Sequence, residues 1–101
     1  MKAEINSVQG TLIVKLEGDI DHHGANEIRE PIDKAMMKKK PKKTILDFQL
    51  VPFCDSSGIA VVVGRYKLAA QMGGKIEVIN TCSQVQKVLK IAGLEKLVKI
   101  N

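Results

Sequence analysis

Two short segments near the start of the chain are rich in β-branched and apolar residues. They are Ala3–Val8 and Thr11–Glu17, and in the second segment apolar residues recur at every other position. A period of two is typical of a strand with one buried face. Gln9 and Gly10 separate the segments, and a two-residue connection that contains glycine favours a hairpin. The start of the chain therefore predicts two antiparallel strands.

The following segment has a helical period. Its apolar residues lie three or four positions apart, as on one face of a helix, and they are Ile28, Ile32, Ala35 and Met36. Pro31 lies inside this pattern and has no backbone N–H. We therefore expect either a kink at Pro31 or a short first helix before the main one.

Two strand-and-helix units follow. Thr44–Phe48 and Lys75–Ile79 read as strands, whereas Ile59–Met72 is long, free of proline and apolar on most sides. This segment predicts a buried helix that stops at the glycines directly after it. Leu50–Cys54 contains Pro52, which a central strand does not tolerate, so this segment is expected to be a loop with apolar anchors.

The end of the chain predicts a third helix. Ser83–Gln86 has the form of a capping box at a helix start. The expected buried face of this helix consists of Val85, Val88, Leu89 and Ala92. Gly93 ends the helix, and Leu94–Ile100 closes the chain as a turn and a short strand or helix.

The order of these elements is ββα-βα-βα, which predicts an α/β fold with a mixed sheet of four to five strands covered by helices. The chain has 101 residues, enough for one core and too few for a second, so residues 1–101 are expected to form a single domain.

The positive charge of the chain comes from one segment. The net charge is +5, but outside Lys38–Lys43 the chain has 11 basic and 11 acidic residues. Such a run is most often a solvated connection, and nucleic-acid binding through it is the minor alternative. Aromatic residues make up only 3% of the chain, which argues against a stacking surface for single-stranded nucleic acid. We expect no specific nucleic-acid partner.

The composition also indicates a compartment. Cys54 and Cys82 do not form a disulfide framework, which favours a reducing environment. No apolar stretch has the length of a membrane span, and the first residues lack the apolar core of a signal peptide. The expectation is a cytoplasmic protein without a membrane partner.

The most unusual polar segment is Asp55-Ser56-Ser57-Gly58, directly before the buried helix. Asp and Ser are preferred N-cap residues, and glycine permits close packing, so a structural role is the simpler interpretation. A hydroxyl at a helix N-terminus is also a good phosphate acceptor, because free N–H groups and the helix dipole favour the added charge. The two interpretations are compatible.

Catalysis is not expected from these residues. Neither Ser56 nor Ser57 has the two flanking glycines of a nucleophile elbow. Gly73–Lys75 precedes a strand, whereas a phosphate-binding loop precedes a helix. The neighbouring carboxylate of Asp55 raises the pKa of a thiol at Cys54, which argues against an activated thiolate. We expect no enzymatic activity and no cofactor.

Asp19, Asp21, His22 and His23 form a second polar cluster. Adjacent histidine side chains diverge, and no distant Cys or His completes a set of four ligands, so we expect no metal site. The cluster is best interpreted as an exposed turn and helix start with Asp21 as the cap. Contact with a partner protein is the second interpretation.

Several segments together resemble a known family. They are Phe53–Ile59 (Phe-Cys-Asp-Ser-Ser-Gly-Ile), Gly64–Lys67 and Gly73–Gly74, and they resemble the bacterial anti-sigma factor antagonists, which share the STAS domain. Gly18–His23 is similar to the segment between the second strand and the first helix in the sporulation-type members. The match spans nearly the whole chain, and it implies a STAS-like fold.

The resemblance implies a switch in place of an enzyme. Such an antagonist binds a cognate anti-sigma factor, itself a serine kinase, and thereby releases a sigma factor. The kinase then phosphorylates the second serine of the motif, here Ser57, and a separate serine phosphatase reverses the modification. The implied environment of the phosphosite is Asp55, Ser56 and Gly58, and the implied partner surface is Asp21, His22, His23 and Ser57.

Alternatives remain open at this stage. The domain could be a STAS phospho-switch in another signalling complex, for example in a stress response in place of sporulation. Binding of nucleic acid through Lys38–Lys43 is a weaker alternative of a different class.

Overall fold

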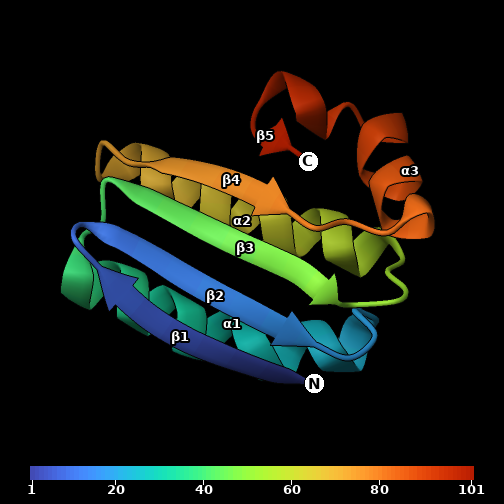
Figure 1. Cartoon of the computed structure of the whole chain (residues 1–101), viewed down its shortest axis with the longest axis horizontal. Helices are drawn as coiled ribbons and strands as arrows, with labels where there is room; N and C mark the ends of the chain where they lie inside the picture. The colour runs from blue at the N-terminus through green and yellow to red at the C-terminus, as the bar shows by residue number, and fades with distance from the viewer.

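The computed structural model describes residues 1–101 and contains a five-stranded sheet with helices packed against it (Figure 1). The strands are β1 (Lys2–Val8), β2 (Thr11–Glu17), β3 (Lys43–Leu50), β4 (Lys75–Ile79) and β5 (Lys99–Ile100). The α-helices are α1 (His22–Lys39), α2 (Ser56–Gln71) and α3 (Ser83–Ile91), and a 3₁₀ turn, η1, spans Leu94–Lys96. The predicted α/β class and the order ββα-βα-βα are confirmed.

The first two strands form the predicted hairpin. β1 and β2 are antiparallel, and their register runs from Lys2 opposite Glu17 to Val8 opposite Thr11. The backbone φ angles of Gln9 and Gly10 are 48° and 82°. Positive φ at both central residues is typical of the hairpin turn whose twist matches the twist of the strands.

The remaining strand pairs are parallel, and the strands lie in the order β1-β2-β3-β4-β5. The connections between parallel strands are expected to be right-handed. Because each new strand is added on the same side of the previous one, the helices in these connections lie on the same face of the sheet. In Figure 1, α1 and α2 accordingly lie behind the sheet, and α3 lies beyond the β4 edge. The prediction that helices cover the sheet is therefore correct for one face only.

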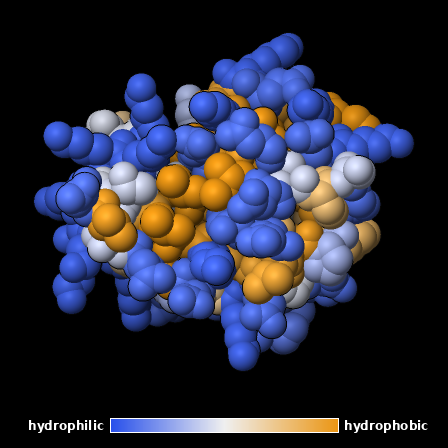
Figure 2. All heavy atoms as spheres, in the orientation of Figure 1, coloured by the Kyte–Doolittle hydropathy of each residue, from blue (hydrophilic) through white to orange (hydrophobic).

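The opposite face of the sheet has no helix over it. Figure 2 shows this face, where apolar side chains are visible between charged ones. Ile13 of β2 lies opposite Ile45 of β3, and both are partly buried. The strands thus have a helix-covered face that forms the core and a mixed face toward solvent.

The core lies between the sheet and its helices, as the sequence pattern predicts. The alternating residues of β2 are buried, as are Ile28, Ile32 and Met36 of α1, whereas Ala35 is only half-buried. Ala92, expected on the buried face of α3, is exposed directly after that helix. The buried apolar residues of the whole domain include Leu12, Val14, Leu16, Ile28, Ile32, Met36, Leu46, Phe48, Val61, Val62, Val78, Val85 and Leu89. These side chains belong to one continuous cluster. None of the helices is both long and apolar enough to cross a membrane.

An ion pair joins α1 to α2. Arg65 Nε lies 2.9 Å from Asp33 Oδ1, and the Arg65 side chain is 8% exposed. Burial lowers the pKa of Arg65, and the opposite charge of Asp33 counteracts this effect. A buried charge needs its partner, because removal of the partner leaves an uncompensated charge in a poorly solvated site.

Pro31 does not divide the first helix. α1 is a single helix of 18 residues with Pro31 inside it, so the prediction of a separate short helix is wrong. The proline lacks the N–H that would bind the Glu27 carbonyl four residues earlier. Pro31 and Glu27 are both exposed, so water can replace the missing donor.

The predicted capping box of the third helix is also wrong. Cys82 is the N-cap of α3, its side chain makes no cap hydrogen bond, and the helix begins at Ser83. Gln86 donates from its side-chain amide to Thr81 Oγ1 at 3.4 Å and does not reach back to Ser83. The motif lies one residue too late in the chain for its serine to be the cap.

The lysine run is only in part a connection between elements. Lys38 and Lys39 lie in the last turn of α1, and Lys43 begins β3. Positive side chains at a helix C-terminus interact favourably with the helix dipole. Pro41 is buried in the connection, and Lys40 has a positive φ of 45° at the helix C-cap. Much of the run therefore has a local structural role.

The loop after β3 has fewer apolar anchors than expected. Leu50, the first residue of the expected loop, still belongs to β3 and is 51% exposed. In the loop itself Val51 and Cys54 are buried, whereas Phe53 is 42% exposed. The expected apolar anchors are therefore Val51 and Cys54, whereas Leu50 and Phe53 do not anchor the segment.

The two phenylalanines provide a matched test of the core. Phe48 is fully buried, and Phe48→Ala is expected to lower the free energy of unfolding by about 3–5 kcal/mol. Phe53→Ala is expected to change it by less than about 1 kcal/mol, because Phe53 is already 42% exposed to water and lies outside the core. Urea denaturation of both variants measures the difference. Equal losses for the two variants would contradict the described core.

Candidate functional site

All three helices begin at the same end of the parallel strands. They follow β2, β3 and β4, which are parallel, so their N-termini lie at the carboxyl ends of these strands. Free N–H groups and the positive end of the dipole lie at each helix start. In open α/β sheets the carboxyl ends of the strands are the usual place for a functional site.

Backbone hydrogen bonds bring the first two helix starts together. The N–H of Ile20 donates to the Phe53 carbonyl at 3.0 Å, and the N–H of Asp55 donates to the Ile20 carbonyl at 3.2 Å. These bonds form a short parallel bridge between Ile20 and Cys54. Asp21 and Asp55 follow the two bridge residues directly. The polar segments that the sequence analysis singled out are therefore neighbours in the fold.

Each of these aspartates is an N-cap. Asp21 Oδ1 accepts a hydrogen bond from the N–H of Gly24 at 2.7 Å, and Asp55 Oδ1 accepts one from the N–H of Ser57 at 2.7 Å. The predicted capping role of Asp21 is confirmed, and Asp55 is the cap in its own motif. Such caps contribute about 0.5–2 kcal/mol each.

The two serines occupy the first positions of α2. Ser56 is exposed and Ser57 is half-buried. The Asp55 cap uses the backbone N–H of Ser57, so the Ser57 hydroxyl is not needed for capping. The capping and acceptor roles thus belong to different groups of the motif.

Gly58 is needed because α2 packs directly against the preceding loop. A Cβ at this position would lie 2.7 Å from Cys54 Cβ and 2.8 Å from Cys54 Sγ. Gly24 has a similar role at the start of α1, where a Cβ would lie 2.5 Å from the Asp19 carbonyl oxygen. Both glycines permit a close approach that any side chain would prevent.

Gln84 supports the loop from the third helix, although no signal in the sequence marks it for this role. Gln84 Oε1 accepts a hydrogen bond from the N–H of Cys54 at 3.1 Å, and Gln84 Nε2 donates to the Cys54 carbonyl at 3.0 Å. The side chain thus pairs with the loop as a neighbouring strand would. A single exposed glutamine at a helix start carries no signal for such a contact.

The two cysteines near the site differ in burial, and the thiol of Cys54 is not activated. Burial raises the pKa of the Cys54 thiol to about 11, and the negative charge of Asp55 adds to this effect. The predicted direction is confirmed, although burial is the larger cause. Cys82 is exposed, and its thiol lies 3.5 Å from the Pro52 carbonyl oxygen.

The two histidines lie in the first turn of α1 and are exposed. His23 Nε2 lies 3.8 Å from Glu27 Oε1, and His22 Nε2 lies 3.4 Å from Asn26 Nδ2. Both side chains therefore contact the next turn of their own helix. No group of three or more His, Cys, Asp and Glu side chains is placed to hold a metal ion.

Comparison with known proteins identifies relatives of the whole chain. The STAS domain profile matches residues 2–101. The chain is 35% identical over 100 residues to an anti-sigma F factor antagonist of Paenibacillus polymyxa. The matched region covers 99% of this chain and 86% of that protein.

Two solved structures are similar as well. The anti-sigma factor antagonist SpoIIAA in its unphosphorylated form matches with a TM-score of 0.84 and 28% identity, over 99% of this chain and 88% of that chain. SpoIIAA of Bacillus in its phosphorylated form matches with a TM-score of 0.76 and 26% identity, over 99% and 91% of the two chains.

Two glycines of α2 offer a matched test of the close packing. Gly58→Ala is expected to lower the free energy of unfolding by about 1–3 kcal/mol, because the new Cβ overlaps Cys54. Gly64→Ala meets no atom within 4 Å and is expected to raise it by up to about 1 kcal/mol through helix propensity. Urea denaturation measures both. A neutral Gly58→Ala variant would show that the loop and helix do not pack as described.

Proposed function

Because the chain belongs to the STAS domain family, we propose that it is an anti-sigma factor antagonist controlled by phosphorylation of Ser57. The unphosphorylated protein binds a cognate anti-sigma factor, which is also a serine kinase, and so releases a sigma factor. Phosphorylation by that kinase ends the interaction, and a separate serine phosphatase restores it. The protein acts as a binding switch in the cytoplasm, without catalysis and without a cofactor.

The observation that supports this proposal most is the arrangement at the start of α2. The Asp55 cap holds Ser57 in the first turn, and the Ile20–Cys54 bridge brings the start of α1 beside it. The Paenibacillus polymyxa relative and SpoIIAA are anti-sigma factor antagonists, and SpoIIAA has been solved in unphosphorylated and phosphorylated forms. A phospho-switch at this helix start agrees with both observations.

The residues around Ser57 have distinct proposed roles. Asp55 orients the first turn, Gly58 lets that turn approach the loop, and Ser56 forms the exposed side of the site. The partner surface consists of Asp21, His22, His23 and Ser57. Its first three members are exposed at the adjacent start of α1, which supports their assignment to one surface.

The electrostatics explain how one phosphate could stop binding without unfolding the domain. A phosphate adds roughly −1.5 to −2 charges, and the helix start favours negative charge by about 0.3–1 kcal/mol. The surface already carries the carboxylates of Asp21 and Asp55. Burial of a further unpaired dianion against a partner costs several kcal/mol, and each 1.4 kcal/mol is a factor of about ten in affinity.

The alternatives are less well supported. A STAS phospho-switch in another signalling complex would use the same site with a different output. Nucleic-acid binding through Lys38–Lys43 is weakened as a hypothesis because Lys38 and Lys39 complete α1, while Lys43 forms an ion pair of 2.9 Å with Glu77.

Phosphorylation by the cognate kinase should occur at Ser57 alone. Tandem mass spectrometry after incubation with kinase and ATP identifies the site. Ser57→Ala should abolish the modification and still bind the kinase, whereas the control Ser56→Ala should remain a substrate. Phosphate on Ser56 or Ser83, with Ser57 unmodified, would contradict the assignment.

The phosphorylated protein should keep its fold and lose its partner. We expect a melting temperature equal to or slightly above that of the free form, because the charge lies at a favourable helix end. Affinity for the anti-sigma factor should fall at least about a hundredfold, which corresponds to about 2.7 kcal/mol. Calorimetry and backbone NMR measure the two effects. A sharp drop in melting temperature, or shifts across the strands, would instead indicate a conformational switch.

A further inference from the structure

The outer edge of the sheet is incomplete beside β4. β5 pairs only with Glu77 and Val78, so no strand lies opposite Lys75 and Ile76. The N–H of Lys75 donates inward, to the Lys42 carbonyl, at 3.0 Å. Successive residues of a parallel ladder direct their backbone groups to opposite edges. The N–H of Ile76 therefore points to the outer edge, where the sheet has no partner for it.

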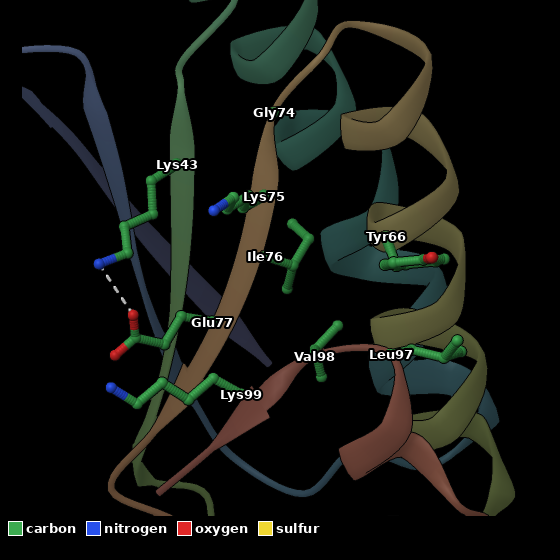
Figure 3. Close-up of a pocket in the computed structure, with 9 residues that line it drawn as sticks. All are labelled: Lys43, Tyr66, Gly74, Lys75, Ile76, Glu77, Leu97, Val98 and Lys99. Carbon is green, nitrogen blue, oxygen red and sulfur yellow. Dashed lines mark ion pairs between the residues drawn. The ribbon is translucent and has the colours of Figure 1, made fainter.

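A groove of about 470 Å³ lies along this edge (Figure 3). Tyr66 of α2 forms its far wall, and Leu97 and Val98 close one end. The backbone of Leu97 has helical torsions, with φ −105° and ψ −38°, so the chain reaches an extended conformation only later, at β5. The groove thus occupies the space in which a longer β5 would continue.

The two sides of the groove differ in chemistry. Lys75, Glu77 and Lys99 lie on the side of the open sheet face, whereas Ile76 and Val98 point toward α2 (Figure 3). The carboxylate of Glu77 is engaged by Lys43 Nζ at 2.9 Å. Lys75 and Lys99 are exposed, and neither has an ion-pair partner in the chain. The groove therefore has a positive rim and an apolar wall.

These features specify the shape and charge of an occupant. Unpaired strand edges bind extended segments, whose backbone completes the ladder. Side chains of an extended segment alternate between the two faces. One set would meet the lysines, and the other would meet half-buried Tyr66 and exposed Leu97, because Ile76 and Val98 are each only 5% exposed and lie beneath them. A helix could not supply backbone groups to the edge of β4.

We propose that the outer edge of β4 binds an extended segment of a partner protein in which acidic and apolar residues alternate. The segment adds to the sheet in line with β5, with acidic side chains at Lys75 and Lys99. The groove lies at the amino end of the parallel strands, and Ser57 lies at their carboxyl end. Binding at this edge is thus separate from the phospho-switch and does not depend on it.

The probe is a capped hexapeptide of alternating Glu and Val with a fluorescein label, titrated into the full chain. We expect saturable binding, with amide NMR shifts concentrated at Lys75, Ile76 and Lys99. A matched Lys and Val peptide should bind at least about tenfold more weakly, because it repels the rim. Shifts concentrated instead on the free edge of β1 or at the start of α2 would overturn the assignment.

Two controls separate strand addition from general attraction. The Glu and Val peptide with N-methyl groups at alternate residues keeps its side chains but cannot complete the ladder, so its affinity should fall at least about tenfold. Equal affinity for the N-methylated and the unmethylated Glu and Val peptides would overturn the proposal. This comparison needs no protein variant and is independent of any effect on folding.

The second control tests the lysines. The double variant Lys75→Glu with Lys99→Glu should bind the peptide at least about tenfold more weakly, whereas Lys38→Glu with Lys39→Glu, which changes the net charge equally, should bind normally. Equal losses in both variants would show only nonspecific attraction. Concentration-dependent shifts at the β4 edge without peptide would instead identify a second copy of this chain as the occupant, against the proposal.

Discussion

The end of the domain that carries the proposed site depends on two backbone hydrogen bonds between Ile20 and the loop before α2. They join Ile20 to Phe53 and Asp55 at 3.0 and 3.2 Å, and both residues of the resulting bridge, Ile20 and Cys54, are fully buried. The bridge extends the β2–β3 pairing beyond the strands themselves. Since the cap residue of each helix follows the bridge directly, the bridge sets the positions of two helix starts at once.

The packing around Cys54 strengthens this constraint. Gln84 occupies both backbone groups of Cys54 from the third helix, and Gly58 approaches so closely that no side chain fits between them. The loop is thus held on three sides, by α1's entry, by α2 and by α3. A frame held in this way is suited to the proposed phosphorylation of Ser57, which would alter the charge of the surface while the backbone remains in place.

The uniform hand of the crossovers explains the rest of the architecture. With strands added in chain order and helices on one face, the helix N-termini collect at one edge, and the other face of the sheet remains open. The same order places the short β5 last. Its two residues cannot cover the five residues of β4, so the fold carries a polar site at one end of the parallel strands and an unpaired edge at the other.

Much of this could be predicted from the sequence because the signals are local. The alternation of β2 and the spacing of Ile28, Ile32 and Met36 reflect burial on one face, and all of these residues are buried. The N-cap role of Asp55 could be predicted from the sequence because a cap hydrogen bond joins groups only two residues apart. The prediction of a capping box at Ser83 is wrong because the helix begins one residue earlier than the motif requires. Cys82 is the N-cap, so Ser83 already lies inside the helix and cannot cap it.

The sequence by itself determined the element order, the core faces and the polar motif before α2, because periodicity and capping act within a few residues. Only the tertiary structure decided that Asp21 lies beside Asp55, that Gln84 holds Cys54, and that the β4 edge lacks a partner. These features join or separate residues that lie far apart along the chain, such as Cys54 and Gln84, which are 30 positions apart. They follow from how strands and helices pack, which no local pattern of side chains encodes.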